Sequence, residues 1–420
     1  MTIRLYADLD SEFKTQWDVI SRGAVDLLPE EEFPQRVRRS IKDNVPLRVK
    51  QGFDPTAPDI HLGHTIGIRK LRQFQDLGHH IVLIVGDYTG LVGDPSGLSA
   101  TRPQLEYDAI MRNAETYQSQ FFKILDKSRT EVRFNGEWFK KMSFTDVMNL
   151  AAKFTVARLL ERDDFEERLR KGNPVSIHEL FYPLMQAYDS VAIRADVEIG
   201  ATEQKFNLLA GRTIQEAYGV EPQCVLTLPV LVGIDGEKRM SKSLGNYIGI
   251  DESPAEIFGK AMSIPDRLIY TYFELATDLT LEKLETVRKM LAQPDVNPML
   301  VKKDLAETLV NMYCPAGSGR QARDEFERVF SQKEIPDEVP EVTSDELRQW
   351  GFDPAKMYLV HLLSRANLTK SNGEARKLIE AGAVEVNGQK IGDTDYELSL
   401  SAGNEALLKV GKRRFLRIRG

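Results

Sequence analysis

The sequence predicts an α/β protein that combines a parallel sheet, a helical insertion, an all-α segment and a small α+β tail. Residues 47–97 alternate between strand-like and helix-like patterns, which indicates the sheet. Residues 102–181 and 253–328 are helical in pattern almost throughout, and the Pro- and acid-rich stretch 331–346 is typical of a linker. With 420 residues, 42% of them hydrophobic, the chain can bury several cores and should divide into two or three domains.

The parallel sheet is inferred from the order of its elements. The run LRVKQGF predicts a strand, LGHTIGIRKLRQFQDLG an amphipathic helix and HHIVLIVGDY a second, buried strand. Two strands joined through a helix form a βαβ unit and are therefore parallel. The segments VEIGATEQKFNLLAGRTIQEAYG and QCVLTLPVLVGIDGEKRM continue the sheet. Ligands of such open sheets bind beyond the carboxyl ends of the strands.

The remaining elements give the domain plan. We expect a catalytic domain over residues 1–250 with its helical insertion over about 102–181, a helical segment and linker over 251–345, and a C-terminal domain over 354–420. The insertion contains one strand-like run, EVRFNGEWF. In the tail, MYLVHLLSRANL and SNGEARKLIEAG predict two helices, and AVEVNGQKI predicts a hairpin because Asn-Gly favours a tight turn. The closing run LLKVGKRRFLRIR predicts a strand pair.

Composition narrows the class of protein. The N-terminus has no apolar run followed by small residues, and no stretch reaches the length that a membrane-spanning helix needs, so we expect neither a secretory signal nor a membrane protein. The only cysteines are Cys224 and Cys314, which are too few for a disulfide framework, so a reducing cytoplasm is the expected setting. The net charge of −7 argues against a surface that is basic all over, although a local basic face remains possible.

The strongest local signal places two histidines where a strand ends and a helix begins. His61 and His64 are separated by Leu62 and Gly63, and the glycine lets a ligand approach the backbone. A helix N-terminus attracts phosphate, and imidazoles there can donate hydrogen bonds that stabilise developing charge. Two other interpretations are histidines that only cap the helix, and a metal site. The metal site lacks a third ligand with suitable spacing, so we expect no protein-bound metal.

Two further stretches carry polar groups in informative patterns. The segment 238–246, KRMSKSLGN, is a basic loop containing Ser and Gly, which suits a polyphosphate leaving group but could also be an exposed charged loop. In YPLMQAYD, helical spacing places Tyr182, Gln186 and Asp189 on one face. The alternative is an amphipathic helix whose polar residues face solvent.

Together these motifs resemble a known family. HLGH and KRMSKS look like the HIGH and KMSKS signatures of class I aminoacyl-tRNA synthetases, and YxxxQAYD resembles the amino-acid-binding segment of tyrosyl-tRNA synthetases. The resemblance implies a Rossmann-like nucleotide-binding domain that activates L-tyrosine with ATP, accompanied by Mg²⁺, and then transfers it to tRNA(Tyr). It also implies a homodimer formed through the helical insertion.

The resemblance implies a role for each matching position. Tyr182, Gln186 and Asp94 would meet the substrate ammonium, Asp189 would accept the phenolic O–H, and Gln204 would meet the substrate carboxyl group or the ribose. Asp54 and Thr89 would lie near the amino acid, and Thr56 near the γ-phosphate. Catalysis would rest on His61, His64, Arg239 and Lys242, and the ATP site would also include Gly63, Gly200, Glu203 and Met240. A buried carboxylate aimed at the phenol would reject phenylalanine by about 10⁴ to 10⁵ without an editing domain.

Four positions depart from the family pattern. Lys50 stands where many tyrosyl enzymes carry a tyrosine that contacts the phenol, so hydroxyl recognition should rest more on Asp189. The segment usually written GGTDQ contains Ala201 and Glu203 here, which puts nucleotide affinity in doubt. Arg239 replaces the first lysine of KMSKS, and its planar, permanently charged group should still bind pyrophosphate.

The tail points to a second, larger substrate. The segment SRANLTKSNGEARKLIEAGAVEVNGQKI resembles the α-L RNA-binding module of bacterial tyrosyl enzymes. Its basic residues would form a local RNA-binding face, although a solvated charge run is the alternative. Those residues are Arg365, Lys370, Arg376 and Lys377, followed by Lys412, Arg413, Arg414, Arg417 and Arg419. Two rival functions remain: a tryptophanyl enzyme, and a catalytically silent paralogue that only binds RNA, which Ala201 and Glu203 motivate.

Overall fold

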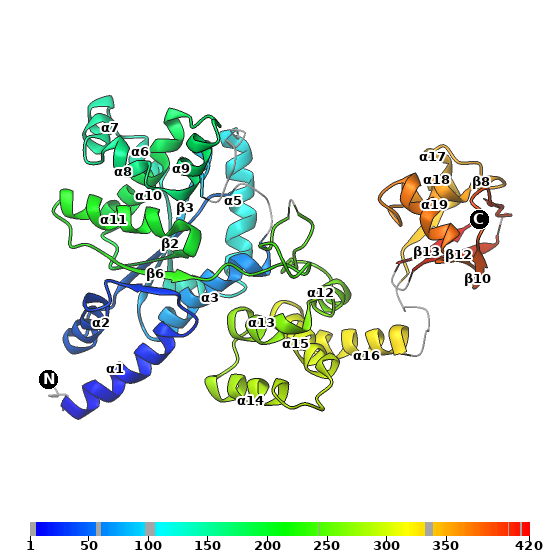
Figure 1. Ribbon diagram of the computed structural model, residues 1–420, viewed down its shortest axis with the longest axis horizontal. Helices are drawn as coiled ribbons and strands as arrows, with labels where there is room; N and C mark the ends of the chain where they lie inside the picture. Colours follow the sequence, from blue (N-terminus) through cyan, green and yellow to red (C-terminus); the bar gives the residue numbers. More distant parts are fainter. Residues whose placement is uncertain are drawn as a thin grey trace. The chain divides into compact units, whose positions relative to one another are not determined.

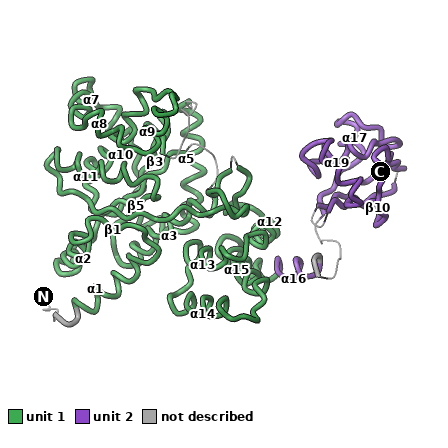
Figure 2. The backbone as a smooth tube through the Cα atoms, viewed as in Figure 1, with its two compact units in different colours: residues 1–320 green, residues 321–420 purple. Residues whose placement is uncertain are grey.

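The computed structural model describes residues 6–55, 60–96, 106–242, 244–331, 339–401, 403–411 and 414–420. The chain forms two compact units, residues 1–320 and 321–420 (Figure 2). Each unit has its own sheet, and the helix α16 (Ser318–Ser331) contains the boundary between them. The predicted α/β class is confirmed.

A six-stranded sheet organises unit 1 (Figure 1). Its order is β1-β6-β5-β2-β3-β4, in which β1 runs antiparallel to β6 and the other neighbours are parallel. The five parallel strands therefore end at one edge, where ligands of open α/β sheets bind. The strands are β1 (Asp26–Leu28), β2 (Arg48–Phe53), β3 (His80–Val85), β4 (Thr130–Phe134), β5 (Val197–Ala201) and β6 (Cys224–Leu228).

The βαβ unit predicted from residues 47–97 is present. Helix α3 (Leu62–Asp76) joins β2 to β3 and packs against both strands, because Ile68, Leu71 and Phe74 recur every three residues on its buried side. The strand predicted inside the insertion is β4, and it pairs with β3 at the edge of the sheet. Unlike the rest of the insertion, which is helical, this segment belongs to the sheet itself.

Helices surround the sheet of unit 1, and the part of unit 1 that follows strand β6 is helical. Those up to the last strand are α1 (Tyr6–Ser21), α2 (Glu32–Asp43), α4 (Thr89–Val92), α5 (Tyr107–Phe121), α6 (Gly136–Phe139), α7 (Phe144–Ala151), α8 (Val156–Leu159), α9 (Asp163–Arg170), α10 (Ile177–Ile193) and α11 (Lys205–Ala217). The later ones are α12 (Pro254–Ala261), α13 (Ile269–Ala276), α14 (Leu281–Leu291) and α15 (Pro298–Tyr313). None of the described helices is long and apolar enough to cross a bilayer.

Unit 2 is a small α+β structure around a five-stranded sheet with the order β10-β9-β12-β13-β7. The predicted Asn-Gly hairpin is confirmed: Asn387 and Gly388 have φ values of 50° and 79°, which suit a tight turn between β9 and β10. The elements are β7 (Glu341–Thr343), α17 (Ser344–Gln349), β8 (Met357–Tyr358), α18 (Leu359–Arg365), α19 (Asn372–Glu380), β9 (Val384–Val386), β10 (Gln389–Ile391), β11 (Glu397–Leu398), β12 (Glu405–Val410) and β13 (Arg414–Arg419).

The linker interpretation of residues 331–346 is wrong for its second half. Strand β7 pairs in parallel with β13, and Val342 is buried in the core of unit 2. Thr343 caps α17 by accepting a hydrogen bond from Glu346 N. The acidic and proline residues indicated a solvent-exposed segment. They gave no sign that Val342 is buried, or that residues 341–343 pair with β13 as an edge strand.

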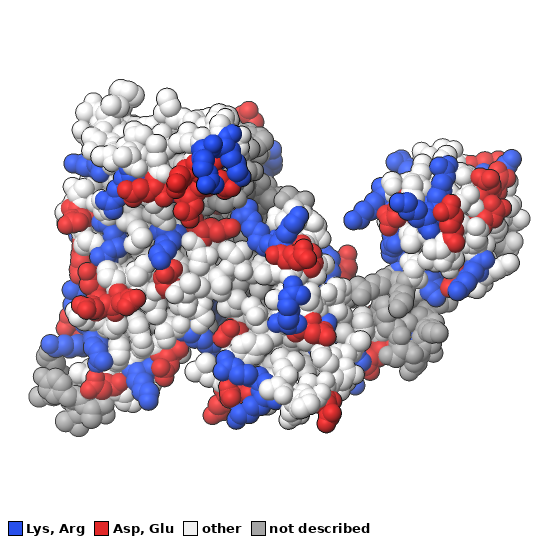
Figure 3. Space-filling view, in the orientation of Figure 1, with Lys and Arg blue, Asp and Glu red and all other residues white. Residues whose placement is uncertain are grey.

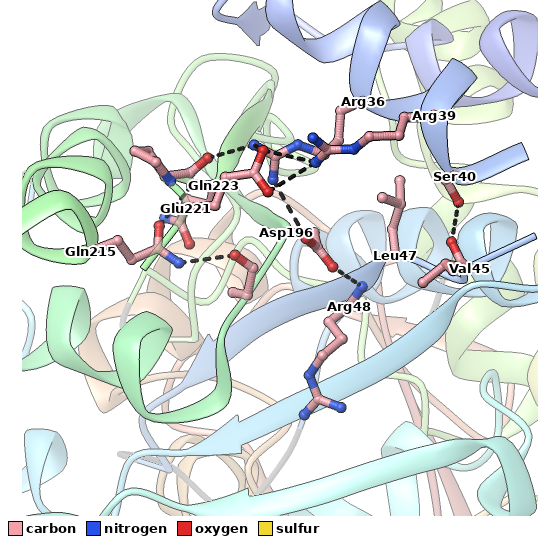
Figure 4. Close-up of polar contacts among 12 residues, drawn as sticks. Arg36, Arg39, Ser40, Val45, Leu47, Arg48, Asp196, Gln215, Glu221 and Gln223 are labelled. Atoms are coloured by element: carbon pink, nitrogen blue, oxygen red, sulfur yellow. Dashed lines mark hydrogen bonds and ion pairs between the residues drawn. The ribbon is translucent and has the colours of Figure 1, made fainter. Parts of the chain in front are cut away.

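A polar clamp holds α2 to the edge of the main sheet where the parallel strands begin (Figure 4). Arg36 is buried, donates to Asp196 Oδ1 (3.4 Å) and Pro222 O (2.9 Å), and forms an ion pair with the carboxylate of Glu221 (2.9 Å). Asp196 in turn accepts from Arg48 N (2.8 Å) at the start of β2. Arg39 also donates to Glu221, but both of these side chains are about half exposed.

We predict that these two arginines differ in their effect on stability. Arg36→Ala removes a buried guanidinium that joins Asp196, Pro222 O and Glu221, and should lower the free energy of unfolding by about 1–3 kcal/mol. Arg39→Ala breaks a solvent-screened ion pair with the same glutamate and should cost about 1 kcal/mol or less. Urea denaturation of the two variants measures the difference, and equal losses would contradict the structural role given to Arg36.

Candidate functional site

A cavity of about 610 Å³ opens at the carboxyl ends of β2 and β5. The N-terminus of α3 forms one wall and the segment 228–242 forms another. Twelve of the site residues predicted from sequence line it: Asp54, His61, Gly63, His64, Asp94, Tyr182, Gly200, Glu203, Gln204, Arg239, Met240 and Lys242. Thr56 lies outside the residues that the structure describes, and Thr89, Gln186 and Asp189 are buried behind the cavity wall.

The two histidines stand at the first turn of α3, which begins at Leu62. Their rings stack with centroids 3.8 Å apart, and His61 N donates to His64 Nδ1 over 3.3 Å. Gly63 makes room for this arrangement, since a Cβ there would lie 3.0 Å from His61 Nδ1. The capping interpretation is therefore correct in geometry, and it leaves the outer edge of His64 available to a ligand.

Both imidazoles are neutral at physiological pH. Burial, followed by the positive charge of Lys242, lowers the pKa of His64 to about 4. Burial, His64 and Lys242 lower the pKa of His61 to about 2. Because His64 Nδ1 accepts a hydrogen bond, its neutral ring carries the proton on Nε2. His64 is thus set up as a neutral hydrogen-bond donor to an anionic group.

A basic loop faces the histidines across the cavity. Met240 N donates to Leu231 O (2.7 Å), which anchors the loop to the segment after β6. The buried side chain of Asn246 accepts from Ser241 N (2.8 Å) and donates to Asp235 Oδ2 (2.7 Å) and Arg239 O (3.0 Å). Sequence analysis did not assign Asn246 a role, although it closes the motif KRMSKSLGN. Its side chain holds both ends of the loop together.

Two of the departures from the family pattern contact each other. Arg239 Nη1 lies 2.9 Å from Glu203 Oε2, and both side chains are a little more than one-third exposed. Glu203 belongs to the short 3-10 turn Thr202–Gln204 that follows β5. The longer acid and the arginine thus form an ion pair across the cavity. The charge of Glu203 therefore has a defined partner, the guanidinium of Arg239.

The opposite end of the cavity carries two carboxylates. Asp54 Oδ2 accepts from Tyr182 OH (2.8 Å), and Asp54 Oδ1 accepts from Thr89 Oγ1 (2.6 Å). Asp94 Oδ2 accepts from Gln204 Nε2 (3.2 Å). A backbone position without a side chain is needed beside them, since a Cβ at Gly86 would lie 2.0 Å from Asp54 Oδ1. Paired carboxylates with a phenol and an amide between them suit an ammonium group.

Asp189 lies deeper and is connected to this end of the cavity. It is 3% exposed and accepts from Trp138 Nε1 (2.9 Å) and Asn135 Nδ2 (3.4 Å). Asn135 Nδ2 also donates to Thr89 Oγ1 (3.0 Å), which bonds Asp54. Burial raises the pKa of Asp189 to about 7, although the charge of Lys50 and the donors Trp138 and Asn135 oppose this rise. Asp189 is therefore buried and linked to the cavity.

Gln186 has a different position from the one expected. Its Nε2 donates to Glu198 Oε1 and its Oε1 accepts from Asn207 Nδ2, each at a distance of 3.0 Å. These contacts use both ends of the amide in a buried network, so the structure does not place Gln186 against the cavity. Asn135 and Trp138 donate to Asp189. Both belong to the segment EVRFNGEWF, which sequence analysis treated only as a strand and to which it assigned no site residue.

Unit 2 carries the predicted basic residues on its surface. Arg365, Lys370, Arg376 and Lys377 are all exposed, on α18, on α19 and between them. The face of unit 2 visible in Figure 3 shows both basic and acidic side chains. The strand β13 contributes less than expected, because Arg417 and Arg419 both pair with Glu341. Lys412 and Arg413 lie outside the described residues.

Among the described residues, no group of three or more His, Cys, Asp and Glu side chains could hold a metal ion. Both described cysteines, Cys224 and Cys314, are free thiols, and burial raises the pKa of each. The cavity therefore offers its ligand hydrogen-bond donors, cations and carboxylates.

Comparison with known families matches both units. A family model described as tRNA synthetases class I (W and Y) matches residues 42–331, and one described as the tyrosine–tRNA ligase SYY-like C-terminal domain matches residues 333–418. The tyrosine–tRNA ligase of Moorella thermoacetica is 49% identical over 410 residues, which cover 98% of this chain and 97% of that protein. That of Thermotoga maritima is 48% identical over 405 residues, covering 96% and 97%.

Solved structures share the fold. A tyrosyl-tRNA synthetase from Archaeoglobus fulgidus complexed with L-tyrosine has a TM-score of 0.59 at 22% identity, covering 74% of this chain and 99% of that one. A C-terminally truncated mitochondrial tyrosyl-tRNA synthetase from Aspergillus nidulans has a TM-score of 0.61 at 20% identity, covering 76% and 94%. At these identities the likeness concerns the fold alone.

We predict that neither cavity histidine titrates near pH 6.5. Their ring C–H resonances should keep the chemical shifts of neutral imidazole from pH 8 to about pH 5.5, because the folded-state pKa values lie near 4 and 2. The unfolded chain takes up protons first as the pH falls below 6.5, so the free energy of unfolding falls with the pH, down to about pH 4 through His64 and to about pH 2 through His61. Histidine-labelled NMR tests this, and titration of either ring near pH 6.5 would contradict the assignment.

Proposed function

The chain belongs to the tyrosine–tRNA ligase family of class I tRNA synthetases, and we propose that the cavity at the ends of β2 and β5 carries out both steps of that reaction. In the first step a carboxylate oxygen of tyrosine attacks the α-phosphorus of ATP, forming tyrosyl-adenylate while the bond to pyrophosphate breaks. In the second, a ribose hydroxyl of the terminal adenosine of tRNA attacks the tyrosyl carbonyl carbon and AMP leaves. No covalent bond to the protein forms.

The phosphates of ATP are assigned to the histidine wall and the basic loop. ATP enters as its Mg²⁺ complex. His64 Nε2–H would donate to phosphate oxygens, and Arg239 and Lys242 would neutralise the charge that develops on the departing pyrophosphate. The neutral state of the imidazoles supports this role: an imidazolium pKa near 4 leaves the ring neutral at pH 7, and a neutral imidazole donates its N–H without giving the proton to the phosphate. Gly63 and Gly200 leave room for the nucleotide.

The amino acid is assigned to the carboxylate end. Asp54, Asp94 and Tyr182 would hold the ammonium, Gln204 the carboxyl group, and Asp189 the phenolic hydroxyl. The observation that carries the proposal is the continuous chain of hydrogen bonds from Asp189 through Asn135 and Thr89 to Asp54. It connects a buried acceptor suited to a phenol with carboxylates suited to an ammonium, in the same cavity as the phosphate-binding groups.

The other substrate and the setting follow from the same family. The exposed basic residues of unit 2 would contact the phosphates of tRNA(Tyr), which favours the α-L interpretation of residues 354–420. Residues 1–250 would form the catalytic domain with its insertion at about 102–181, and residues 251–345 would support the tRNA. The two free thiols suit the reducing cytoplasm, where the chain would act.

The reaction is tested by tyrosine-dependent exchange of labelled pyrophosphate into ATP. We expect exchange with tyrosine and none with tryptophan, and the reverse would overturn the proposal. His64→Ala should slow adenylate formation in a single turnover by about 10²-fold while tyrosine affinity changes little. His80→Ala is the matched control, because His80 begins β3 at the opposite edge of the sheet. An unchanged rate in His64→Ala would remove that histidine from the phosphate site.

A homodimer is proposed through the helical insertion. Large apolar side chains that a monomer would leave in water cluster on α7–α10: Phe144 is 79% exposed, Ile177 78% and Val156 61%. Figure 3 shows few charged side chains over α7. Such a surface suits a second copy of the chain.

We predict that Phe144→Asp combined with Ile177→Asp converts the dimer into a monomer in equilibrium sedimentation, because charges on both sides of a twofold contact repel and lose water. Leu281→Asp is the control, since Leu281 is 53% exposed but lies on α14, away from the insertion. A monomeric unmodified chain, or a dimer that survives the double substitution, would exclude this surface.

A further inference from the structure

Lys50 and Glu198 form an ion pair that is completely enclosed. Both side chains are 0% exposed, and Lys50 Nζ lies 2.9 Å from Glu198 Oε1. Lys50 belongs to β2 and Glu198 to the neighbouring strand β5. Removing two charges from water is expensive, and apolar side chains of similar size would often be at least as stable. A pair in this position therefore invites a functional explanation.

The contacts of Lys50 point to the turn of α10 that carries Asp189. Its Nζ donates to Gln186 O (2.9 Å) and to Ser190 Oγ (2.8 Å). These residues stand three positions before and one position after Asp189. Glu198 holds the same turn from the next strand, accepting from Gln186 Nε2 (3.0 Å) and Ser190 Oγ (3.2 Å). Lys50 is thus fixed in place directly behind the acceptor assigned to the phenol.

The charges around Asp189 give Lys50 a specific effect. Trp138 and Asn135 face Asp189 from the segment after β4, and Lys50 and Glu198 face it from β2 and β5. Asp54 and Tyr182 are reached through Thr89 and belong to the cavity. Among these groups Lys50 is the one cation. Burial raises the pKa of Asp189, Lys50 is the strongest opposing influence, and Glu198 adds only the weakest contribution.

We propose that Lys50 is a positioning residue that favours the ionised form of Asp189 and thereby strengthens the preference for tyrosine over phenylalanine. The inference rests on the proposed role of Asp189. When phenylalanine binds, an ionised Asp189 lacks the phenolic O–H that tyrosine would donate, which disfavours phenylalanine. A protonated Asp189 does not require that donor, so it discriminates less between the two amino acids. The glutamate makes the buried lysine tolerable, and the hydrogen bonds to α10 hold its charge at a constant distance from Asp189.

The test compares a neutral variant with one that keeps both charges. Lys50→Met combined with Glu198→Gln removes the pair without leaving either charge alone, and Glu198→Asp disturbs the same packing while preserving both charges. The measurement is kcat/KM for tyrosine and phenylalanine in pyrophosphate exchange between pH 6 and 9. Circular dichroism and thermal unfolding check that each variant is folded.

We expect the acid limb of the tyrosine profile to move upward by about one pH unit in the neutral variant, because Asp189 then stays protonated to higher pH. The tyrosine-over-phenylalanine ratio should fall about tenfold at pH 6.5 and recover by pH 9. Glu198→Asp should keep the original limb. If the acid limb of the kcat/KM profile for tyrosine stays in place in the neutral variant, or shifts equally in both variants, Lys50 has only a structural role and the inference is overturned.

Asp189→Asn separates failure of this inference from failure of the site assignment. Loss of discrimination in Asp189→Asn, together with an unmoved limb in the neutral variant, would overturn the role of Lys50 alone. Unchanged discrimination in Asp189→Asn would overturn the assignment of Asp189 to the phenol, and the inference with it.

Discussion

The buried carboxylate of Asp189 places the strictest demand on this structure, because an acid in a dry interior needs hydrogen-bond donors and a nearby cation. The donors come from Trp138 and Asn135, 51 and 54 positions earlier in the chain, and the cation comes from Lys50 on β2. These groups meet only if β2, the turn after β4 and helix α10 come together. The order of strands in the sheet provides that meeting point, since β2 and β4 both border β3.

The same sheet edge organises the phosphate side. The segment after the basic loop returns to the histidine motif, where Leu62 N donates to Ile248 O (2.9 Å) and Ile250 N to Ile60 O (3.2 Å). The loop is therefore attached at both ends, through Met240 to the segment after β6 and through residues 248–250 to the start of α3. Because the loop is attached on both sides, only the residues between the two attachments can move toward the negative charge that develops on a leaving group.

The charged residues that depart from the family pattern each form an ion pair. Glu203 and Arg239 form an ion pair across the cavity, and Lys50 is joined to Glu198 behind Asp189. Taken singly, a longer acid, an arginine or a buried lysine would each weaken the case for a working site. Each of them has a partner of opposite charge within 3 Å, so the altered positions form complete interactions.

The sequence by itself determined the elements whose signal is local. Apolar periodicity predicted β2, α3 and β3, the Asn-Gly pair predicted the β9–β10 hairpin, and helical spacing placed Tyr182, Gln186 and Asp189 on one face of α10. Only the tertiary structure decided which of those side chains reach the cavity. Gln186 bonds Glu198 and Asn207, Asn135 and Trp138 hold Asp189, and one buried valine, Val342, adds β7 to a sheet. The physical reason is that a polar side chain has the same local pattern whichever partner satisfies it, and the partner depends on which distant segments the fold brings within hydrogen-bond range.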